Sequence, residues 1–482
     1  MKIKLKNIGM LDEAEFEVGN ITLICGENNT GKTYATYSLY GHLDFLHNNL
    51  TGVFFSTVQK HLNHLIPEEY TITISIYEIL AIYKEVIEKT YDDYKEKLSE
   101  ILAGKDGDFD NSVFLNQELN HFLDKLSSDD IVNKFKEFSE SKNLINLTEI
   151  NIEYIKLDYK NDDKNFELKD RFIVIKTMQL LTSFFLFLTP KYPRAFILSA
   201  ERTGASMFQK ELDVNKNEIV DRISQVKSSD IKGAVIDILV EKYSRYPKPV
   251  KDNIYFVREL DEVVKKTSFI QDGINKNSKS KDLYQNILDL LFEIVGGKYL
   301  VSQEGIEFAP GAKKRITKGK FLIQRASSSV RSLLILNHYI LHEAQKGDIL
   351  MIDEPELNLH PKNQILLARL FTLLANAGIK IFITTHSDYV VRELNNCIIL
   401  NGLTSEQIQM FKLKDYIEEN KIDSKDIKAY IAKNVKGKNI LEKVKITQEE
   451  GIFMSTFDEP IDTQNENQSM IYEKICEIRY DK

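Results

Sequence analysis

The sequence predicts an α/β fold, with a mainly parallel sheet, antiparallel strands at the N-terminus and a large, mostly helical insertion. The first observation is a set of short apolar runs, each with a polar end, at Ile21–Cys25, Asp348–Asp353 and Lys380–Thr385. Runs of this length without polar alternation are typical of strands that are buried on both faces. The second observation is a glycine-rich loop directly after the first run. The third is a middle region whose apolar residues recur at helical spacing.

The order of these elements divides the chain into four parts. Alternating apolar residues between Ile3 and Val18 predict two strands ahead of the first buried run. In the middle region, Ile76–Leu102 has the clearest amphipathic helical pattern. The predicted parts are an N-terminal lobe (1–60), a mostly helical insertion with a few strands (61–298), a C-terminal lobe (299–400) and an α+β tail (401–482).

Composition is that of an ordinary globular protein. The 482 residues are 43% hydrophobic and 28% charged, and the net charge of −8 gives no overall attraction to nucleic acid or to an anionic membrane. The most apolar stretch, Ile173–Leu188, is interrupted by Lys176 and Gln179 and is short for a bilayer span, so we expect a buried helix and no membrane association. Three scattered cysteines and an N-terminus without a signal-peptide core predict a cytoplasmic protein.

Residues 26–33, GENNTGKT, match the pattern G-x-x-x-x-G-K-[ST] at every fixed position. Two glycines let the backbone approach an anion closely, and the helix that follows adds the positive end of its dipole. We expect Lys32 to act on the β- and γ-phosphates and the Thr33 hydroxyl to bind Mg²⁺. A chance match is the alternative, but the preceding strand and following helix are the context that this motif requires. The predicted nucleotide contacts here are Gly26, Asn28, Asn29, Thr30, Gly31, Lys32 and Thr33.

Polar groups also stand at the ends of the two later apolar runs. Asp353 is placed to hold Mg²⁺, and Glu354 beside it to polarise the attacking water as a general base. His386 follows the next strand, at the edge where ligands bind in open α/β sheets, and is predicted to contact the γ-phosphate. An acidic surface turn and a structural histidine are the alternatives. The predicted catalytic residues are Lys32, Glu354 and His386, and the predicted metal ligands are Thr33 and Asp353.

Four segments carry a resemblance to a known class of ATPases: GENNTGKT (26–33), ASSSVRS (326–332), LMIDEPELNLHP (350–361) and TTHS (384–387). Their order resembles the ATP-binding-cassette (ABC) ATPase heads of the RecF, structural-maintenance-of-chromosomes and overcoming-lysogenisation-defect families. In size and layout the chain is most similar to ATPase subunits of bacterial anti-phage defence systems such as Septu and PARIS. The resemblance implies a P-loop NTPase of ABC-ATPase head type that uses ATP and Mg²⁺. It also implies a Walker B role for Asp353 and a dimer-contacting loop at Asn358, Leu359 and His360.

The resemblance assigns ASSSVRS as a signature segment that contacts the γ-phosphate of ATP held by a second subunit. Ser327, Ser328 and Ser329 would then contribute to nucleotide binding across a homodimer or a higher homo-oligomer. The family pattern has glycine where this chain has Ser329, and a simple helix N-cap is the alternative. Arg202 ends another apolar strand, and it is expected either to contact phosphate or a neighbour or to form an ordinary loop ion pair.

The favoured function is an ATP-hydrolysing sensor or clamp in bacterial defence that controls a separate nuclease or toxin effector. The alternatives are a DNA-repair ATPase of RecF or structural-maintenance type, and a nucleotide-locked scaffold with little turnover. Nucleic acid is a further candidate partner because basic residues cluster next to the signature segment, although a solvated face is the commoner meaning of such a cluster. These residues are Lys313, Lys314, Arg315, Lys318 and Lys320.

Overall fold

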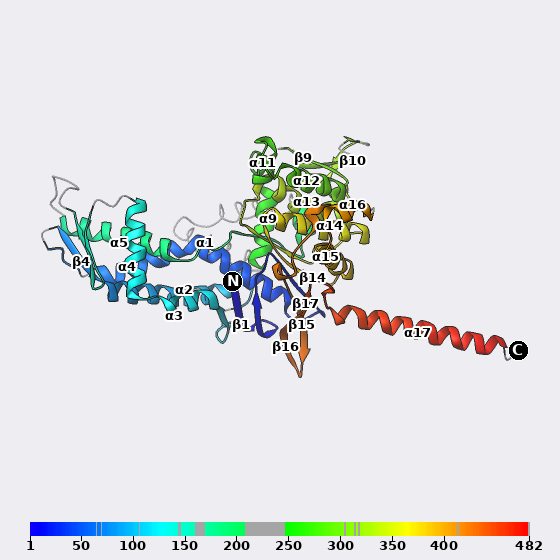
Figure 1. Cartoon of the computed structure of the whole chain (residues 1–482), viewed down its shortest axis with the longest axis horizontal. Coiled ribbons are helices and arrows are strands. Elements are labelled where there is room, and N and C mark those ends of the chain that lie inside the picture. Colours follow the sequence, from blue (N-terminus) through cyan, green and yellow to red (C-terminus); the bar gives the residue numbers. More distant parts are fainter. Residues whose placement is uncertain are drawn as a thin grey trace, which may run out of the picture.

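The computed structural model describes most of the chain between residues 1 and 480. It shows a central body, an arm of long helices on one side and one projecting helix on the other (Figure 1). Residues 64, 69, 106, 143–145, 160–168, 208–245, 303–304, 313–314, 317–318, 412 and 414 lie outside the described part, and for 169–170, 312, 315–316, 455–461 and 477–480 the backbone alone is described.

A nine-stranded sheet forms the centre of the body, in the order β5-β1-β2-β16-β15-β3-β14-β13-β8. The five strands from β15 to β8 are parallel, whereas β5, β1 and β2 pair antiparallel. This confirms the predicted mainly parallel sheet with antiparallel N-terminal strands. The strands are β1 (Lys2–Ile8), β2 (Leu11–Glu17), β3 (Ile21–Gly26), β5 (Val113–Asn116), β8 (Ala195–Leu198), β13 (Ile349–Asp353), β14 (Lys380–Thr385), β15 (Ile427–Val435) and β16 (Lys438–Lys443).

The three predicted apolar runs are neighbouring strands in the middle of this sheet. Every residue of β3 and β13 is buried, because helices cover both faces there. Cys25 on β3 pairs with Thr385 on β14, and Asp353 on β13 pairs with Thr384. Parallel pairing in this register brings the carboxyl ends of all three strands to one edge, which is where the polar residues of the motifs lie.

The arm is built on two long helices, α1 (Lys32–Leu62) and α2 (Ile76–Leu102), which pack against each other. Helix α2 begins at Ser75, whose side chain accepts a hydrogen bond from the Tyr77 amide, and its buried residues recur every three or four positions. A small antiparallel sheet lies at the far end of the arm (Figure 1). The other arm elements are β4 (Thr71–Ser75), α3 (Gln117–Lys125), α4 (Ser128–Lys142), β6 (Leu147–Ile150), β7 (Tyr154–Asp158) and α5 (Lys169–Leu188).

A second hydrophobic core lies on the opposite face of the sheet from the arm. Its helices come from the chain before and after residues 208–245, which lie outside the described part, and they cover β3, β14 and β13. Its elements are α6 (Arg202–Met207), α9 (Lys248–Arg258), α10 (Leu260–Val263), α11 (Phe269–Asn275), α12 (Lys281–Val295), β9 (Gly297–Ser302), β10 (Gly305–Ala312), β11 (Arg315–Ile316), β12 (Phe321–Leu322), the 3-10 turn η1 (Ile323–Arg325), α13 (Ser328–His338), the π-helical turn η2 (Tyr339–Glu343), α14 (Pro361–Asn376) and α15 (Asp388–Leu400).

The C-terminal region contributes to the body rather than forming only a tail. Strands β15 and β16 insert between β2 and β3, so residues 427–443 complete the central sheet. The acidic residues Asp458, Glu459 and Asp462 lie in a helix that projects from the body (Figure 1). The remaining elements are α16 (Ser405–Met410), η3 (Glu418–Asn420), η4 (Ser424–Asp426), β17 (Ile446–Thr447), β18 (Gly451–Ile452) and α17 (Ser455–Tyr480).

The division into four parts stays a prediction, and the structure locates its boundaries within elements. Helix α1 runs across residue 60, and β8, from the expected insertion, is an edge strand of the central sheet. The apolar helix α5 packs one face into the arm core, while Ile175, Leu186 and Phe187 are more than a third exposed. Within the described residues, its segment Arg171–Leu188 is long and apolar enough to cross a membrane by length and composition alone, and half of it is buried in the protein.

Candidate active site

The glycine-rich loop joins the end of β3 to the start of α1 and has an unusual backbone. Gly26, Asn29 and Gly31 have φ values of 135°, 61° and 91°, a region that L-residues with side chains rarely adopt. The Thr30 hydroxyl donates to the carbonyl of Glu27 at 2.7 Å and closes the loop from within. Asn28 and Asn29 are exposed, whereas Thr30 is buried. The loop therefore presents its backbone amide groups at the first turn of α1, as an anion-binding loop does.

Gly26 is required for a second reason that the sequence did not reveal. A Cβ atom at this position would lie 2.0 Å from the carbonyl oxygen of Ala432 on β15. The neighbouring hairpin also contacts the loop, because the Asn439 side chain donates to the carbonyls of Asn29 at 3.3 Å and Met10 at 2.7 Å. Residues more than 400 positions away thus fix the shape of the loop.

Lys32 lies over its own loop. Its ammonium group donates to the carbonyls of Gly26 at 3.1 Å and Glu27 at 2.6 Å, and only 7% of the residue is exposed. Burial lowers the pKa of Lys32, while the nearby carboxylates of Glu354 and Asp353 act in the opposite direction. A phosphate group bound in the loop would replace the two carbonyls as the partner of this cation.

The Asp353 carboxylate links the phosphate-binding loop to the middle of the sheet. One oxygen accepts a hydrogen bond from the Thr33 hydroxyl at 3.1 Å, and the other accepts one from the Thr384 hydroxyl. Asp353 is 2% exposed, and burial raises its pKa to about 6 although both hydroxyls favour the charged form. The two predicted metal ligands, 320 positions apart in the chain, therefore share one hydrogen bond. A hydroxyl and a carboxylate are hard oxygen donors of the type that Mg²⁺ prefers.

Glu354 and His386 face each other at the same edge. The Glu354 carboxylate oxygen lies 3.6 Å from His386 Nε2, and both side chains are about one-third exposed. His386 lowers the pKa of the Glu354 carboxyl, so this group is ionised at neutral pH. Glu354 has φ of 50°, and its amide donates to the carbonyl of Thr384 at 3.1 Å. The Glu356 side chain accepts from the His386 amide at 2.6 Å and holds the histidine segment in place.

Arg202 is buried, and its side chain forms no ion pair with the described residues, which was one of the two roles expected for it. It is 2% exposed, and its guanidinium donates to the carbonyls of Asp353 at 2.8 Å and Glu354 at 2.7 Å. A further bond to the carbonyl of Ser199 at 3.0 Å ties this strand end back to β8. The arginine thus clamps the backbone that carries both acidic side chains, a role that only the parallel packing of β8 on β13 makes visible.

The serines of the signature segment stand apart from this site. Ser327 is the N-cap of α13, and its hydroxyl accepts from the Val330 amide at 3.4 Å and pairs with the Ser329 hydroxyl at 2.8 Å. The Ser328 hydroxyl accepts from Arg331 at 3.1 Å. These side-chain bonds are all local, and Ser327 is exposed. The structure therefore brings Lys32, Thr33, Asp353, Glu354 and His386 together, whereas the hydrogen bonds of the three serine side chains stay within their own segment.

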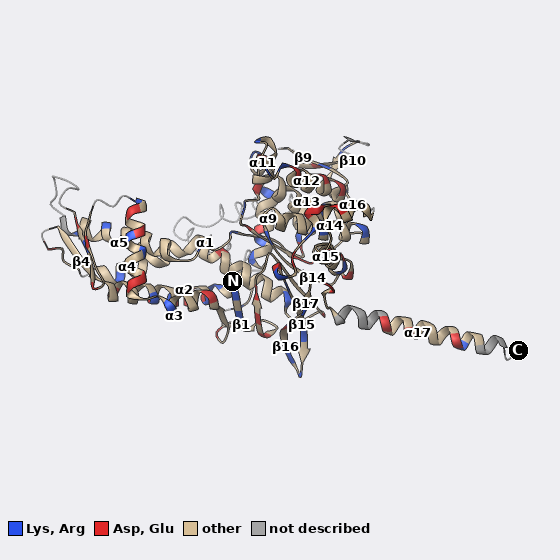
Figure 2. Ribbon diagram, viewed as in Figure 1, with Lys and Arg blue, Asp and Glu red and all other residues tan. Residues whose placement is uncertain are grey.

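The remaining predicted contacts have mixed outcomes. In the loop expected at a dimer contact, Asn358 donates to the Thr203 hydroxyl at 3.4 Å, Leu359 is buried and His360 caps α14. Within the basic cluster, Lys320 pairs with Glu307 at 2.6 Å. Lys313, Lys314 and Lys318 lie outside the described residues, as does the side chain of Arg315. In Figure 2, Lys and Arg also mark the β15–β16 hairpin, and Asp and Glu mark much of α4.

Sequence reasoning missed two groups that shape the site, Thr384 and Asn439. Thr384 was seen only as part of the TTHS segment, yet a hydroxyl at the end of a buried strand next to an acidic strand end is a signal for a carboxylate contact. Asn439 carried no sequence signal, because its contacts with the loop arise from the insertion of the C-terminal hairpin into the sheet.

Similar proteins are known for this chain. The "Retron Vc95 probable ATPase" of Vibrio cholerae serotype O1 biovar El Tor is 23% identical over 452 residues, which is 86% of this chain and 74% of that protein. Among solved structures, an Smc head bound to the C-winged helix domain of ScpA matches with a TM-score of 0.31 and 9% identity, over 92% of this chain and 97% of that one. An Smc head with an extended coiled coil, bound to the C-terminal domain of ScpA derived from Pyrococcus furiosus, matches with a TM-score of 0.28 and 10% identity, over 97% and 98%.

The family comparison covers most of the molecule and both halves of the site. The model of the AAA ATPase domain matches residues 1–391, which span the glycine-rich loop, the acidic strand end and His386. The chain belongs to the AAA ATPase domain family and is an ATPase.

Proposed function

We propose that the chain binds ATP with Mg²⁺ at the edge formed by β3, β13 and β14 and hydrolyses it there. The observation that carries this proposal is the hydrogen bond between the Thr33 hydroxyl and the Asp353 carboxylate. It supports a single site because the phosphate-binding loop and the acidic strand end come from distant segments. Lys32 is next in the chain to Thr33, and its ammonium faces the space that the loop encloses.

Each residue has a separate task in this mechanism. The loop amides and Lys32 bind the phosphates, and Thr33 and Asp353 hold Mg²⁺, which neutralises charge on the β- and γ-phosphates when bound. Glu354, ionised at neutral pH and half-buried, accepts a proton from the attacking water. His386 is 3.6 Å from Glu354 and contacts the γ-phosphate side of the site. Arg202 keeps the Asp353–Glu354 backbone in place without touching the reacting atoms.

A cavity of about 620 Å³ beside the loop offers a place for the base of the nucleotide. It lies between the β1–β2 turn and the segment that follows α2. Tyr34, the first residue after Thr33, supplies an aromatic wall, and Asp12 supplies an acceptor for a base amino group.

We infer that two copies of the chain pair when ATP is bound, with Ser327–Ser329 of each copy facing the nucleotide of the other. The serines are at the N-terminus of the helix α13, where the helix dipole and free amides favour an anion. The hydrogen bonds of their side chains stay within residues 327–331 and reach no residue of the phosphate-binding loop in the described part of the chain, which is compatible with a contact made across a dimer. Ser329 in the place of the family glycine adds bulk, so this contact is expected to be weaker than in related heads.

We also propose that this ATPase is the sensor or clamp subunit of a bacterial defence system and controls a separate nuclease or toxin. Similarity to a protein named as a retron ATPase supports this role over that of a DNA-repair ATPase. Nucleic-acid contact through the basic cluster gains no support from Lys320, which is paired with Glu307.

Glu354→Gln tests the proposed chemistry. The amide keeps the size of the side chain but cannot accept the proton, so phosphate release is expected to fall by about 10²-fold or more. Binding of ATP should persist, and dimers should accumulate in ATP, as measured by analytical ultracentrifugation. Glu100→Gln, an exposed carboxylate on α2, serves as the matched control and should behave as the unaltered protein.

Two results would contradict the proposal. Phosphate release at the unaltered rate in Glu354→Gln would remove Glu354 as the base. Unaltered protein that retains bound ATP after purification and shows no phosphate release would instead establish the nucleotide-locked scaffold.

A further inference from the structure

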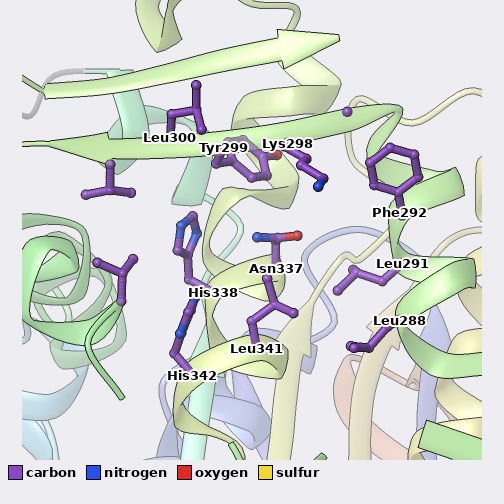
Figure 3. A pocket seen from close by; sticks show the side chains of 13 residues that line it. Leu288, Leu291, Phe292, Lys298, Tyr299, Leu300, Asn337, His338, Leu341 and His342 are labelled. Atoms are coloured by element: carbon purple, nitrogen blue, oxygen red, sulfur yellow. The ribbon is translucent and has the colours of Figure 1, made fainter. Parts of the chain in front are cut away.

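A second cavity lies away from the phosphate-binding loop, in the core that carries the signature helix. It has a volume of about 530 Å³, within the usual range for small-molecule sites. Helix α12, strand β9 and the junction between α13 and the π-helical turn η2 form its walls (Figure 3). π-Helical turns are frequent at functional sites. None of its lining residues belongs to the ATPase site described above.

Asn337 is the first polar group of this cavity. Its side chain points into the space between α12 and β9 (Figure 3), and only 9% of the residue is exposed. No hydrogen bond joins its amide to any other residue in the described part of the chain. The amide faces the cavity, so a ligand or water there can donate to its oxygen and accept from its nitrogen.

His338 is the second polar group. Its Nδ1 lies 2.8 Å from the carbonyl oxygen of Leu334, and because a carbonyl can only accept, Nδ1 carries the hydrogen. Burial lowers the pKa of His338 to about 4, so the ring is neutral at physiological pH and Nε2 is an acceptor. The cavity thus combines an amide that both donates and accepts with the imidazoles of His338 and of His342, whose Nδ1 lies 2.8 Å from the carbonyl oxygen of Lys266.

The rim and the walls of the cavity indicate what else its ligand must contain. Lys298 is exposed at the rim, and among the described residues no carboxylate forms an ion pair with it. The walls are largely apolar and partly aromatic, and the Tyr299 ring is tilted by 55° against Phe308, with 5.3 Å between the ring centroids. The wall residues nearest the polar groups in Figure 3 are Leu288, Leu291, Phe292, Tyr299 and Leu341.

We propose that this cavity binds a nucleoside monophosphate. The planar base lies between the apolar walls, its hydrogen-bonding edge faces Asn337 and His338, and the phosphate lies at Lys298. An amide can form two hydrogen bonds with the edge of a base, which an apolar ligand would leave unused. Asn337 and His338 are the last residues of α13, the helix whose first turn carries Ser328 and Ser329. The ligand would therefore contact the same helix as the signature serines.

Titration calorimetry with AMP, GMP, CMP and UMP tests the site in the full chain. The experiment uses a Lys32→Ala background, which removes the phosphate-binding lysine, so its outcome does not depend on the proposed ATPase mechanism. At least one monophosphate should bind at a single site. Lys298→Glu should weaken the binding of that monophosphate by about tenfold or more and leave the affinity for the matching nucleoside unchanged, because only the phosphate contacts the lysine. Asn337→Leu, which replaces the amide by a side chain of similar volume, should weaken the binding of both the monophosphate and the nucleoside.

Lys279→Glu is the matched control, since it makes the same charge reversal at an exposed residue outside the cavity. Absence of saturable binding by all four monophosphates up to about 1 mM would overturn the proposal. So would binding that survives both Lys298→Glu and Asn337→Leu. Lys298 is exposed, so its variant keeps the test decisive even where Asn337→Leu fails to fold.

Discussion

His42 makes the protein sensitive to acid, and the size of this effect follows from its surroundings. It lies on α1, the helix that starts at the phosphate-binding loop, and it is fully buried, with no hydrogen bond from any described residue to either ring nitrogen. Its neighbours are the aromatic rings of Tyr91 and Tyr94 on α2 and Phe114 on β5, which carry no charge. Burial lowers the pKa of His42 from 6.5 to about 3. The folded state therefore excludes a proton that the unfolded chain binds readily.

The sign and the magnitude follow from proton linkage. The pKa of His42 is lower in the folded state than in the unfolded state. Its titration therefore leaves the free energy of unfolding unchanged above about pH 6.5 and lowers it as the pH drops from there toward 3. At pH 5 the unfolded histidine is almost fully protonated and the folded one is neutral, which lowers the free energy of unfolding by about 2 kcal/mol. Below pH 3 the loss reaches about 5 kcal/mol.

His42→Phe is the perturbation that isolates this contribution. Phenylalanine suits the aromatic neighbours and has no site for a proton, so the variant should lose less stability between pH 7.5 and pH 5 by about 2 kcal/mol. Urea unfolding followed by circular dichroism at the two pH values measures the difference, and every other titrating group cancels in the comparison. Equal losses in the unaltered protein and the variant would refute the reasoning, because they would show that the ring is solvated in the folded state.

Two further predictions concern the phosphate-binding edge. Arg202→Lys keeps the buried charge but cannot bond the carbonyls of Asp353 and Glu354 at once. In steady-state measurements of phosphate release, kcat should therefore fall by about tenfold or more while KM for ATP changes little. A change in KM alone would contradict the proposed role of Arg202 as a clamp. Gly26→Ala should abolish ATP binding and lower the melting temperature, because the added Cβ would lie 2.0 Å from the carbonyl oxygen of Ala432. The control is Gly52→Ala, whose added Cβ meets nothing within 4 Å, and it should leave ATP binding and the melting temperature unchanged. Nucleotide binding by Gly26→Ala at unaltered affinity would contradict this account.

Local sequence was enough wherever one element decides its own geometry. The apolar runs of β3, β13 and β14 predicted buried parallel strands, since runs of this length that end in polar or glycine residues favour strands over helices. Helix α2 begins and ends at the predicted residues, Ile76 and Leu102, because its apolar residues recur at helical spacing and Ser75 caps it. The candidate site residues at strand ends were predictable because parallel strands bring their carboxyl ends to one edge.

Contacts between distant segments were beyond local reasoning. The hairpin of β15 and β16 was expected to lie in a separate tail, since its residues alternate only weakly and nothing local shows that the sheet has a space between β2 and β3. For Arg202 the sequence left open a contact with phosphate or a neighbour and a loop ion pair, and only the pairing of β8 with β13 shows that it is buried against the acidic strand end.

The sequence by itself predicted that this protein is an ATPase, because the glycine-rich loop, the acidic strand end and the histidine each consist of residue types at fixed short spacings. Tertiary structure alone decided how these groups are held. The Thr33–Asp353 bond, the Arg202 clamp and the approach of Ala432 to Gly26 all join segments more than 100 residues apart. Such contacts depend on the order of strands in the sheet, and strand order is set by the total burial that the whole chain achieves, which no short window of sequence contains.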